Sequence, residues 1–243
     1  LVKAWESKNA KNAAKAGGVS LMALSLAACG GSSTTTTTSS GTTTTVTTPT
    51  PTALSSGTSD VYDGSVSDPD NQGVTITANQ LTLDATDIIN AGSGTDTLAI
   101  TNTAANGGIL PAELNGVENI QMTSYGASSI DLLVATGVEK VVSKGSTAND
   151  TFSNIQSLAS VEVDGSSNAV TVSYANALVT ATAEAAVEVK GGSTVSVLNI
   201  GAAGGGEFTV VNITTSGTTA NTITLLEDAA SSAVGDLVTV NVT

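Results

Sequence analysis

The chain has 243 residues and is strongly acidic, with 21 aspartates and glutamates against seven lysines and no arginine. The first 28 residues hold four of the lysines and one acid, so the remainder carries 20 acids and three lysines, a net charge of −17. A surface this negative repels phosphate backbones and anionic lipid headgroups, which excludes nucleic acid as a partner. Aromatic residues make up only 2% of the chain, and its small aliphatic side chains suit stacked rungs better than a globular core.

The chain contains no histidine and a single cysteine, which removes most catalytic systems. Neither a Ser-His nor a Cys-His nucleophile can be built, and no intrachain disulfide can form. The glycine-rich stretch 201–206 lacks the Lys-Ser/Thr of a phosphate-binding loop. A carboxylate pair such as Glu162 with Asp164 is the remaining option for sugar cleavage, but we expect that strand face to be solvated and aromatic platforms are scarce. We therefore predict that the protein is not an enzyme.

The N-terminal segment, residues 1–28, has the order of a secretory signal. Its lysines lie between residues 3 and 15, and the apolar run 19–28 follows them. This run is shorter than the roughly 20 apolar residues that span a bilayer. Leu26-Ala27-Ala28-Cys29 resembles the lipobox of bacterial lipoproteins, in which the cysteine is diacylated and becomes the new N-terminus.

The lipobox resemblance implies a membrane anchor at Cys29, because two acyl chains on one residue hold a protein stably. In that family, a glycine after the cysteine, here Gly30, implies passage to the outer membrane. We therefore expect the protein at the outer membrane and cell surface, facing the outside. The alternative is a fortuitous apolar stretch with a free thiol.

Residues 29–59 are rich in threonine, serine and proline and have almost no apolar side chains to bury. Such a segment cannot offset its ordering entropy, so we predict a disordered tether. The stretch 60–243 differs in composition, with short β-branched runs such as Gly73–Thr77 and Thr97–Thr101 between clusters of Gly, Asn, Asp and Ser. Alternation of apolar and polar residues over four to six positions indicates strands, so this body is predicted to be nearly all β.

A weak internal repeat runs through the body. Gly116-Val117-Glu118-Asn119-Ile120 recurs as Gly137-Val138-Glu139-Lys140-Val141, and further Val-Glu or Val-Asn phrases follow. The valines at 117, 138, 161, 187 and 211 are 21, 23, 26 and 24 residues apart, which suits one turn of a parallel β-helix, or β-solenoid. The alternative is one or two β-sandwiches with the same strand spacing. The repeated glutamate is expected to point to solvent.

The phrase Leu-Asn-Gly-Val-Glu-Asn-Ile (114–120) and its echo at 136–141 resemble an element of surface-layer proteins and repeat adhesins of Gram-negative bacteria. The resemblance covers roughly residues 80–200. It implies self-assembling or adhesive β-structure at the cell surface, often tied to calcium. We therefore expect a non-enzymatic structural or adhesive surface protein that self-associates. The alternatives are a phage or virion fibre, which would trimerise, and a ligand-binding surface lipoprotein.

One motif in the sequence indicates a metal-binding site. Residues 91–99 resemble the calcium-binding nonapeptide of RTX proteins, with Asp96 in its aspartate position. Asp87 holds the same position nine residues earlier, Asp84 lies close to it, and Asp150 belongs to a third partial copy. Calcium binds six to eight oxygens. Asp87 and Asp96, nine residues apart, are expected to lie in register on adjacent turns and to supply carboxylate oxygens. The alternative is that these residues only form hydrophilic turns. Asp68, Asp70 and Asn71 form a further acidic turn, which we expect to be a solvated loop.

Overall fold

The computed structural model describes residues 34–39, 42–47, 53–57, 59–64, 73–109, 111, 113–180, 182–204, 206, 208–226 and 239–243. The predictions for the signal segment, for Cys29 and for the acidic turn at Asp68, Asp70 and Asn71 lie outside these residues. The chain divides into two compact units, Leu1–Thr50 and Pro51–Thr243.

In the first unit, β1 (Thr34–Ser39) pairs antiparallel with β2 (Thr42–Thr47). The structure therefore contains a hairpin where the sequence predicts a spacer without secondary structure. Threonine is β-branched and favours extended backbone, which explains pairing between two threonine runs. A lone two-stranded hairpin is only marginally stable in water, so this pairing adds little to the stability of the protein.

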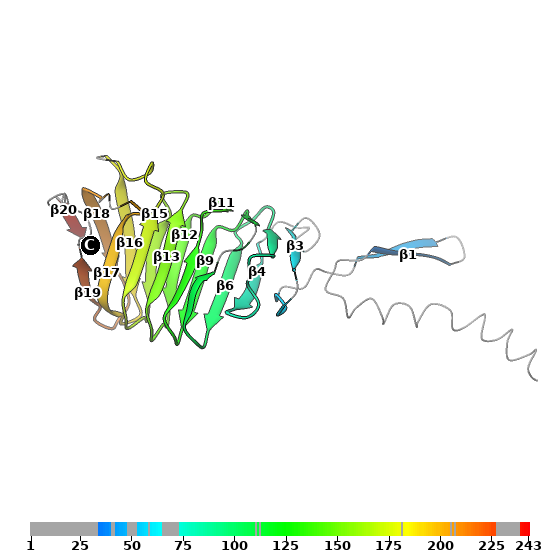
Figure 1. The fold of residues 1–243 in the computed structure, drawn as a ribbon, viewed down its shortest axis with the longest axis horizontal. Coiled ribbons are helices and arrows are strands. Elements are labelled where there is room, and N and C mark those ends of the chain that lie inside the picture. Colours follow the sequence, from blue (N-terminus) through cyan, green and yellow to red (C-terminus); the bar gives the residue numbers. More distant parts are fainter. Residues whose placement is uncertain are drawn as a thin grey trace, which may run out of the picture. The chain divides into compact units, whose positions relative to one another are not determined.

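The second unit is a parallel β-solenoid, the predicted fold, and not the alternative β-sandwich. Its strands form three parallel sheets, and the longest has eight strands (Figure 1). We call it the long sheet. In spatial order its strands are β4 (Thr75–Asn79), β6 (Thr97–Asn102), β9 (Asn119–Ser124), β12 (Lys140–Lys144), β14 (Ser160–Asp164), β16 (Glu184–Lys190), β18 (Val210–Thr215) and β20 (Thr239–Val242).

The other two sheets supply the remaining strands of the solenoid turns. The six-stranded sheet comprises β7 (Asn106–Ile109), β10 (Ser128–Asp131), β13 (Asp150–Ile155), β15 (Val170–Tyr174), β17 (Thr194–Ala202) and β19 (Thr222–Leu226). The four-stranded sheet comprises β3 (Val61–Asp63), β5 (Ile88–Asn90), β8 (Glu113–Asn115) and β11 (Ala135–Thr136). From β5 to β13 the chain visits the four-stranded, long and six-stranded sheets in turn. From β14 onward it alternates between the long and six-stranded sheets, so residues about one turn apart become neighbours throughout.

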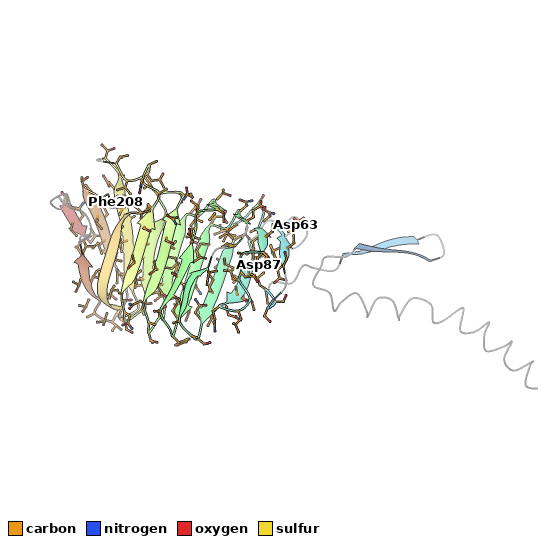
Figure 2. All side chains as sticks on the ribbon, viewed as in Figure 1. Asp63, Asp87 and Phe208 are labelled. Atoms are coloured by element: carbon orange, nitrogen blue, oxygen red, sulfur yellow. The ribbon has the colours of Figure 1, made fainter. Side chains whose placement is uncertain are left out.

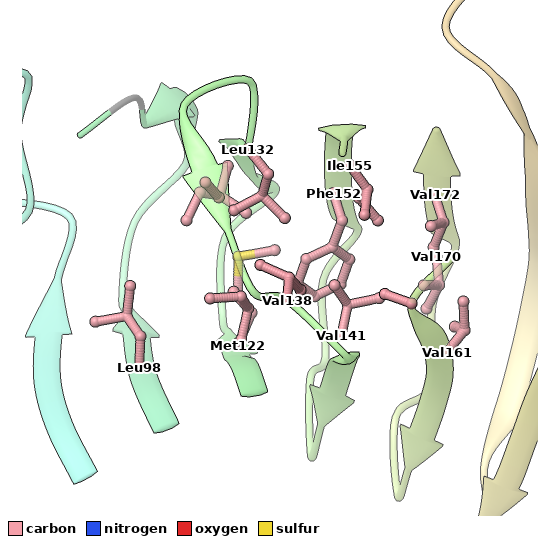
Figure 3. Packing of buried hydrophobic residues seen from close by; sticks show 14 of the residues in the cluster. Leu98, Met122, Leu132, Val138, Val141, Phe152, Ile155, Val161, Val170 and Val172 are labelled. Atoms are coloured by element: carbon pink, nitrogen blue, oxygen red, sulfur yellow. The ribbon is translucent and has the colours of Figure 1, made fainter. Parts of the chain in front are cut away.

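The core consists of columns of apolar side chains that stack from turn to turn. Parallel pairing in register places the same strand position of each turn above the last, and alternate residues point inward. Figure 3 shows Phe152, Val170 and Val172 beside side chains of the long sheet, such as Val141, in one continuous core. One column of buried residues along the long sheet is Ile76, Leu98, Ile120, Val141, Val161, Val187 and Ile213.

The predicted repeat is correct in period but partly wrong in register. Ile120 pairs with Val141, as the two copies of the Gly-Val-Glu phrase require. Val161, however, pairs with Val141 and not with Val138. The Val-Glu phrase therefore occupies two different positions, before the strand in early turns and inside the strand from β14 onward. Both placements point valine into the core, so apolar periodicity alone does not distinguish them.

The two ends of the long sheet differ. Beside β4, Ala53 forms a parallel bridge with Thr77, and the Leu54 N–H donates to the Thr77 carbonyl at 3.0 Å. The Leu54 side chain is buried there. At the opposite end β20 is the last strand in the sheet, and all of its side chains are exposed. Val240 and Val242 are 44% and 63% exposed. The β4 end is therefore covered by residues of this chain, whereas the described part of the chain leaves β20 as an open edge.

Candidate functional site

Asp87, one of the predicted calcium ligands, lies immediately before β5 with its side chain fully buried. Its Oδ1 accepts the Asp60 N–H at 3.0 Å, and its Oδ2 accepts the Asp84 N–H at 2.7 Å. Burial raises the pKa of Asp87, although these two backbone hydrogen bonds act in the opposite direction. The carboxylate thus joins Asp60 of the preceding turn to Asp84 of its own turn, and Figure 2 places Asp87 in the N-terminal part of the solenoid.

Asp84 has a local role in the same turn. Its Oδ1 accepts the Thr86 N–H at 2.8 Å and the Thr86 hydroxyl at 2.6 Å. The hydroxyl and the backbone N–H of Thr86 lower the pKa of Asp84. This arrangement is the side-chain-to-backbone bond that stabilises tight turns.

Asp96 lies immediately before β6 and is also fully buried. Its Oδ1 accepts the Val74 N–H at 2.7 Å, from the preceding turn of the solenoid. Its own N–H donates to Glu118 Oε2 at 2.7 Å, from the following turn. Val74, Asp96 and Glu118 thus occupy equivalent positions on three turns, and carboxylates connect one turn to the next. Gly92 and Gly94, with φ of 98° and 119°, supply the backbone turn before Asp96.

The structure does not place Asp87 and Asp96 in register on adjacent turns, and that expectation is wrong. Asp87 precedes a strand of the four-stranded sheet, whereas Asp96 precedes a strand of the long sheet. One turn here separates hydrogen-bonded residues by 22 to 27 positions, so nine residues cover only part of a turn. Asp150 lies at a third place, the start of β13. Within the described residues, no three acidic or cysteine side chains gather as a metal site.

A mixed-charge cluster occupies the outer face of the long sheet and contains all three lysines of the body. Glu162 Oε2 contacts Lys140 Nζ at 3.0 Å, and Glu162 Oε1 contacts Lys190 Nζ at 2.8 Å. Asp164 stands in register between Lys144 and Lys190. Sequence reasoning did not find this cluster, because its oppositely charged partners are 20 or more residues apart and meet only through the strand register.

Glu162 departs from the expectation of a solvated glutamate. Its side chain points outward but is only 11% exposed, because the two lysine side chains lie over it. Burial opposes its ionisation, but hydrogen bonds and charge from Lys190 and Lys140 more than offset this and lower the pKa of Glu162. The carboxylate is held ionised and paired, which does not suit the proton-donating member of a glycosidase pair.

Comparison with protein-family models, with curated proteins and with solved structures gives no significant match. Among the described residues, no helix is both long and apolar enough to cross a bilayer. The strand pairing of the structure itself defines the class of protein, a parallel β-solenoid.

Proposed function

We propose that this protein is a non-enzymatic structural or adhesive component of a bacterial cell surface, anchored through Cys29 and able to self-associate. The observation that carries the proposal is the regular stack of parallel turns, in which the same strand positions pair in register from one turn to the next. A strand edge with unpaired backbone groups is a template for another strand. We infer the location at the cell surface from the lipobox resemblance and the acidic composition.

The open end has the chemistry of an association surface. β20 continues the column of inward positions, since Val240 and Val242 are in register with Val211 and Ile213. Both valines remain exposed at this edge. Pairing of β20 with a further strand, from a following turn or from a second copy, would bury this apolar surface and satisfy backbone groups together. End-to-end association extends the solenoid without any new kind of contact.

The placement of the aromatic residues supports a structural role over a ligand-collecting one. Sugar-binding sites use exposed aromatic platforms. Four of the five aromatic residues in the body are buried in the core: Tyr62, Phe152, Tyr174 and Phe208. The ring of Phe208 packs edge-on against Tyr174 at 5.3 Å between centroids, and the Tyr174 hydroxyl donates to the Ala159 carbonyl. Of these five described residues, only Tyr125 presents a large exposed ring.

The hydrogen bonds of the acidic turns favour a structural role for them over calcium binding. Asp87 has both oxygens engaged by backbone N–H groups, and Asp84 receives two hydrogen bonds from Thr86. A calcium ion needs six to eight oxygens that converge on one point. We therefore assign these aspartates to the support of turns, which leaves the surface role independent of calcium.

Self-association through β20 is tested by sedimentation velocity over a range of protein concentrations. We expect concentration-dependent linear oligomers, and we expect Val240→Lys with Val242→Lys to abolish them, because charges on an edge strand prevent pairing. Leu133→Lys is the matched control, since Leu133 is 57% exposed and lies on a different part of the solenoid. A monomer at all concentrations, or equal loss in the control, would refute the proposal for β20.

A further inference from the structure

The outer face of the long sheet differs in charge from the rest of the solenoid. We call the outward positions of its eight strands the long face (Figure 1). The described residues contain 14 aspartates and glutamates and three lysines. All three lysines lie on the long face, but only four of the acids do, so ten acids and no lysine lie elsewhere among the described residues. The four acids of the long face are Glu162, Asp164, Glu184 and Glu188.

The N-terminal half of the long face carries no charge. The outward positions of β4, β6 and β9 hold threonine, asparagine, glutamine and alanine, and parallel pairing sets them in register from strand to strand. Short polar side chains on a regular sheet leave a surface against which a second sheet can pack. This half of the face therefore accepts a neighbour without electrostatic repulsion.

Lys144 is the lysine of the long face with the most accessible charge. Lys140 and Lys190 share Glu162, whereas Lys144 is exposed at the last outward position of β12. Within the described part of the chain it forms no ion pair. Asp164 lies in register beside it on β14. The face thus presents a lysine and a carboxylate side by side, which is a self-complementary pair for a second copy related by a two-fold axis.

The charge pattern of the solenoid favours a second copy of the chain as the occupant of the long face. Like charges that face each other across an interface repel. Contacts through the acidic turns of two copies would place such charges together, because those surfaces hold no lysine among the described residues. The long face avoids this repulsion, since it is nearly neutral and provides cations for the carboxylates of a neighbour.

A two-fold axis parallel to the strands, midway between β12 and β14, gives a consistent register for two long faces. It sets β12 of one copy opposite β14 of the other, so Lys144 of each copy faces Asp164 of the other copy. It also sets β9 opposite β16, so Glu188 and Lys190 face uncharged residues of β9. Glu162 faces an uncharged residue of β12. In this register no two like charges of the long face oppose each other.

We propose that the long face is a lateral contact between two copies of this chain, related by a two-fold axis between β12 and β14. The proposal rests on the self-association proposed above and gives it a second direction, across the solenoid as well as along it. Eight strands spaced about 4.8 Å apart, each of about five residues, span roughly 34 Å by 16 Å. Two such faces bury on the order of 1,100 Å², the size of a weak, transient interface. Lys144 therefore stays accessible on unpaired copies.

Zero-length cross-linking of isotope mixtures tests this contact residue by residue. Equal amounts of unlabelled and heavy-nitrogen-labelled protein are treated with a carbodiimide, which joins a lysine amine to a carboxylate in direct contact. We expect cross-linked peptides that join a labelled to an unlabelled chain through Lys144 and Asp164. Glu139 is exposed and lies outside the long face, so it is the reference for random collisions. Mixed-label links from Lys144 to Glu139 as frequent as those to Asp164 would overturn the contact.

Charge reversal gives an independent test by sedimentation velocity at low salt. Asp164→Lys should raise the Kd of association by about tenfold or more, because Lys144 then faces a like charge. Glu139→Lys makes the same change in net charge outside the long face and should leave association unchanged. Combining Asp164→Lys with Lys144→Asp should restore association. Equal effects of Asp164→Lys and Glu139→Lys would overturn the contact.

Failure of this contact is distinguishable from failure of self-association as a whole. Oligomers that form without the mixed-label link between Lys144 and Asp164 would overturn the lateral contact and leave end-to-end association in place. A monomer at every concentration would overturn the lateral contact together with the self-association proposed above.

Discussion

The Lys140–Glu162–Lys190 cluster gives a prediction whose magnitude follows from the structure. Glu162→Gln keeps the shape of the side chain and removes its charge, so both ion pairs are lost. The side chain of Lys190 is 32% exposed and that of Lys140 is 38% exposed. Solvent screening therefore limits the contribution of each ion pair to the free energy of unfolding to about 0.5–1 kcal/mol, the upper part of the range for exposed pairs. The free energy of unfolding at pH 7 should fall by about 1–2 kcal/mol, or about 2–8 °C in Tm for a domain of this size.

The effect should depend on pH with a defined sign. The pKa of Glu162 is lower in the folded protein than in the unfolded chain, mainly because the lysines outweigh the burial. The stabilisation is therefore present above the unfolded pKa and is lost as the pH falls through the folded pKa. Urea denaturation of the unmodified protein and Glu162→Gln should differ at pH 7 and converge at strongly acidic pH.

The matched control is Glu139→Gln, which removes the charge of an exposed glutamate immediately before β12. It should change the free energy of unfolding by less than about 0.5 kcal/mol. A double-mutant cycle with Lys190→Met separates the ion pair from other effects of the substitution. A difference between Glu162→Gln and the unmodified protein that stays constant from pH 7 to acidic pH would refute the ion-pair explanation.

Three further predictions concern the core and the buried carboxyls. Phe152→Ala, in the fully buried column between Ile130 and Val172, should cost about 3–5 kcal/mol in chemical denaturation, whereas a cost below about 1 kcal/mol would contradict the observed packing. Asp150→Asn should stabilise the protein at pH 7, because burial raises the pKa of Asp150 and its ionised form therefore destabilises the folded state. The unmodified protein loses this stability as the pH rises through the folded pKa of Asp150, so the advantage of the variant should vanish at acidic pH. A lower free energy of unfolding for the variant than for the unmodified protein at pH 7 would count against this explanation. Calcium at millimolar concentration should leave Tm unchanged, and an increase abolished by Asp87→Ala with Asp96→Ala would show that these aspartates bind the ion.

The fold could be predicted from the sequence because the solenoid repeats its pattern on every turn. Short runs of alternating apolar and polar residues, few aromatic residues and a spacing near one turn all favour stacked turns. The structure confirms this fold. The register was harder to predict, because Val138 and Val161 both face the core although they occupy different positions of the turn. A phrase of two or three residues does not show where in the turn it belongs.

The contacts between turns could be predicted only in part. The sequence singled out Asp87, Asp96 and Asp150 as calcium ligands. The structure buries all three, and the nine-residue register assumed for the first two does not hold. The Lys140–Glu162–Lys190 cluster could not be found before the strand register was known. The buried polar residues Asn102, Ser124, Ser146, Ser166 and Ser193 did leave a signal, since they recur at or shortly after the ends of five successive long-sheet strands, β6 to β16.

The surface role is tested most directly by labelling intact cells that make the full protein with an amine-reactive reagent that cannot cross membranes. Lys144 is exposed on the outer face of the long sheet and provides a reactive amine. We expect the protein to be labelled on intact cells, and we expect Cys29→Ser to remove this cell-associated label. Labelling only after the cells are broken open would contradict the proposed location at the cell surface.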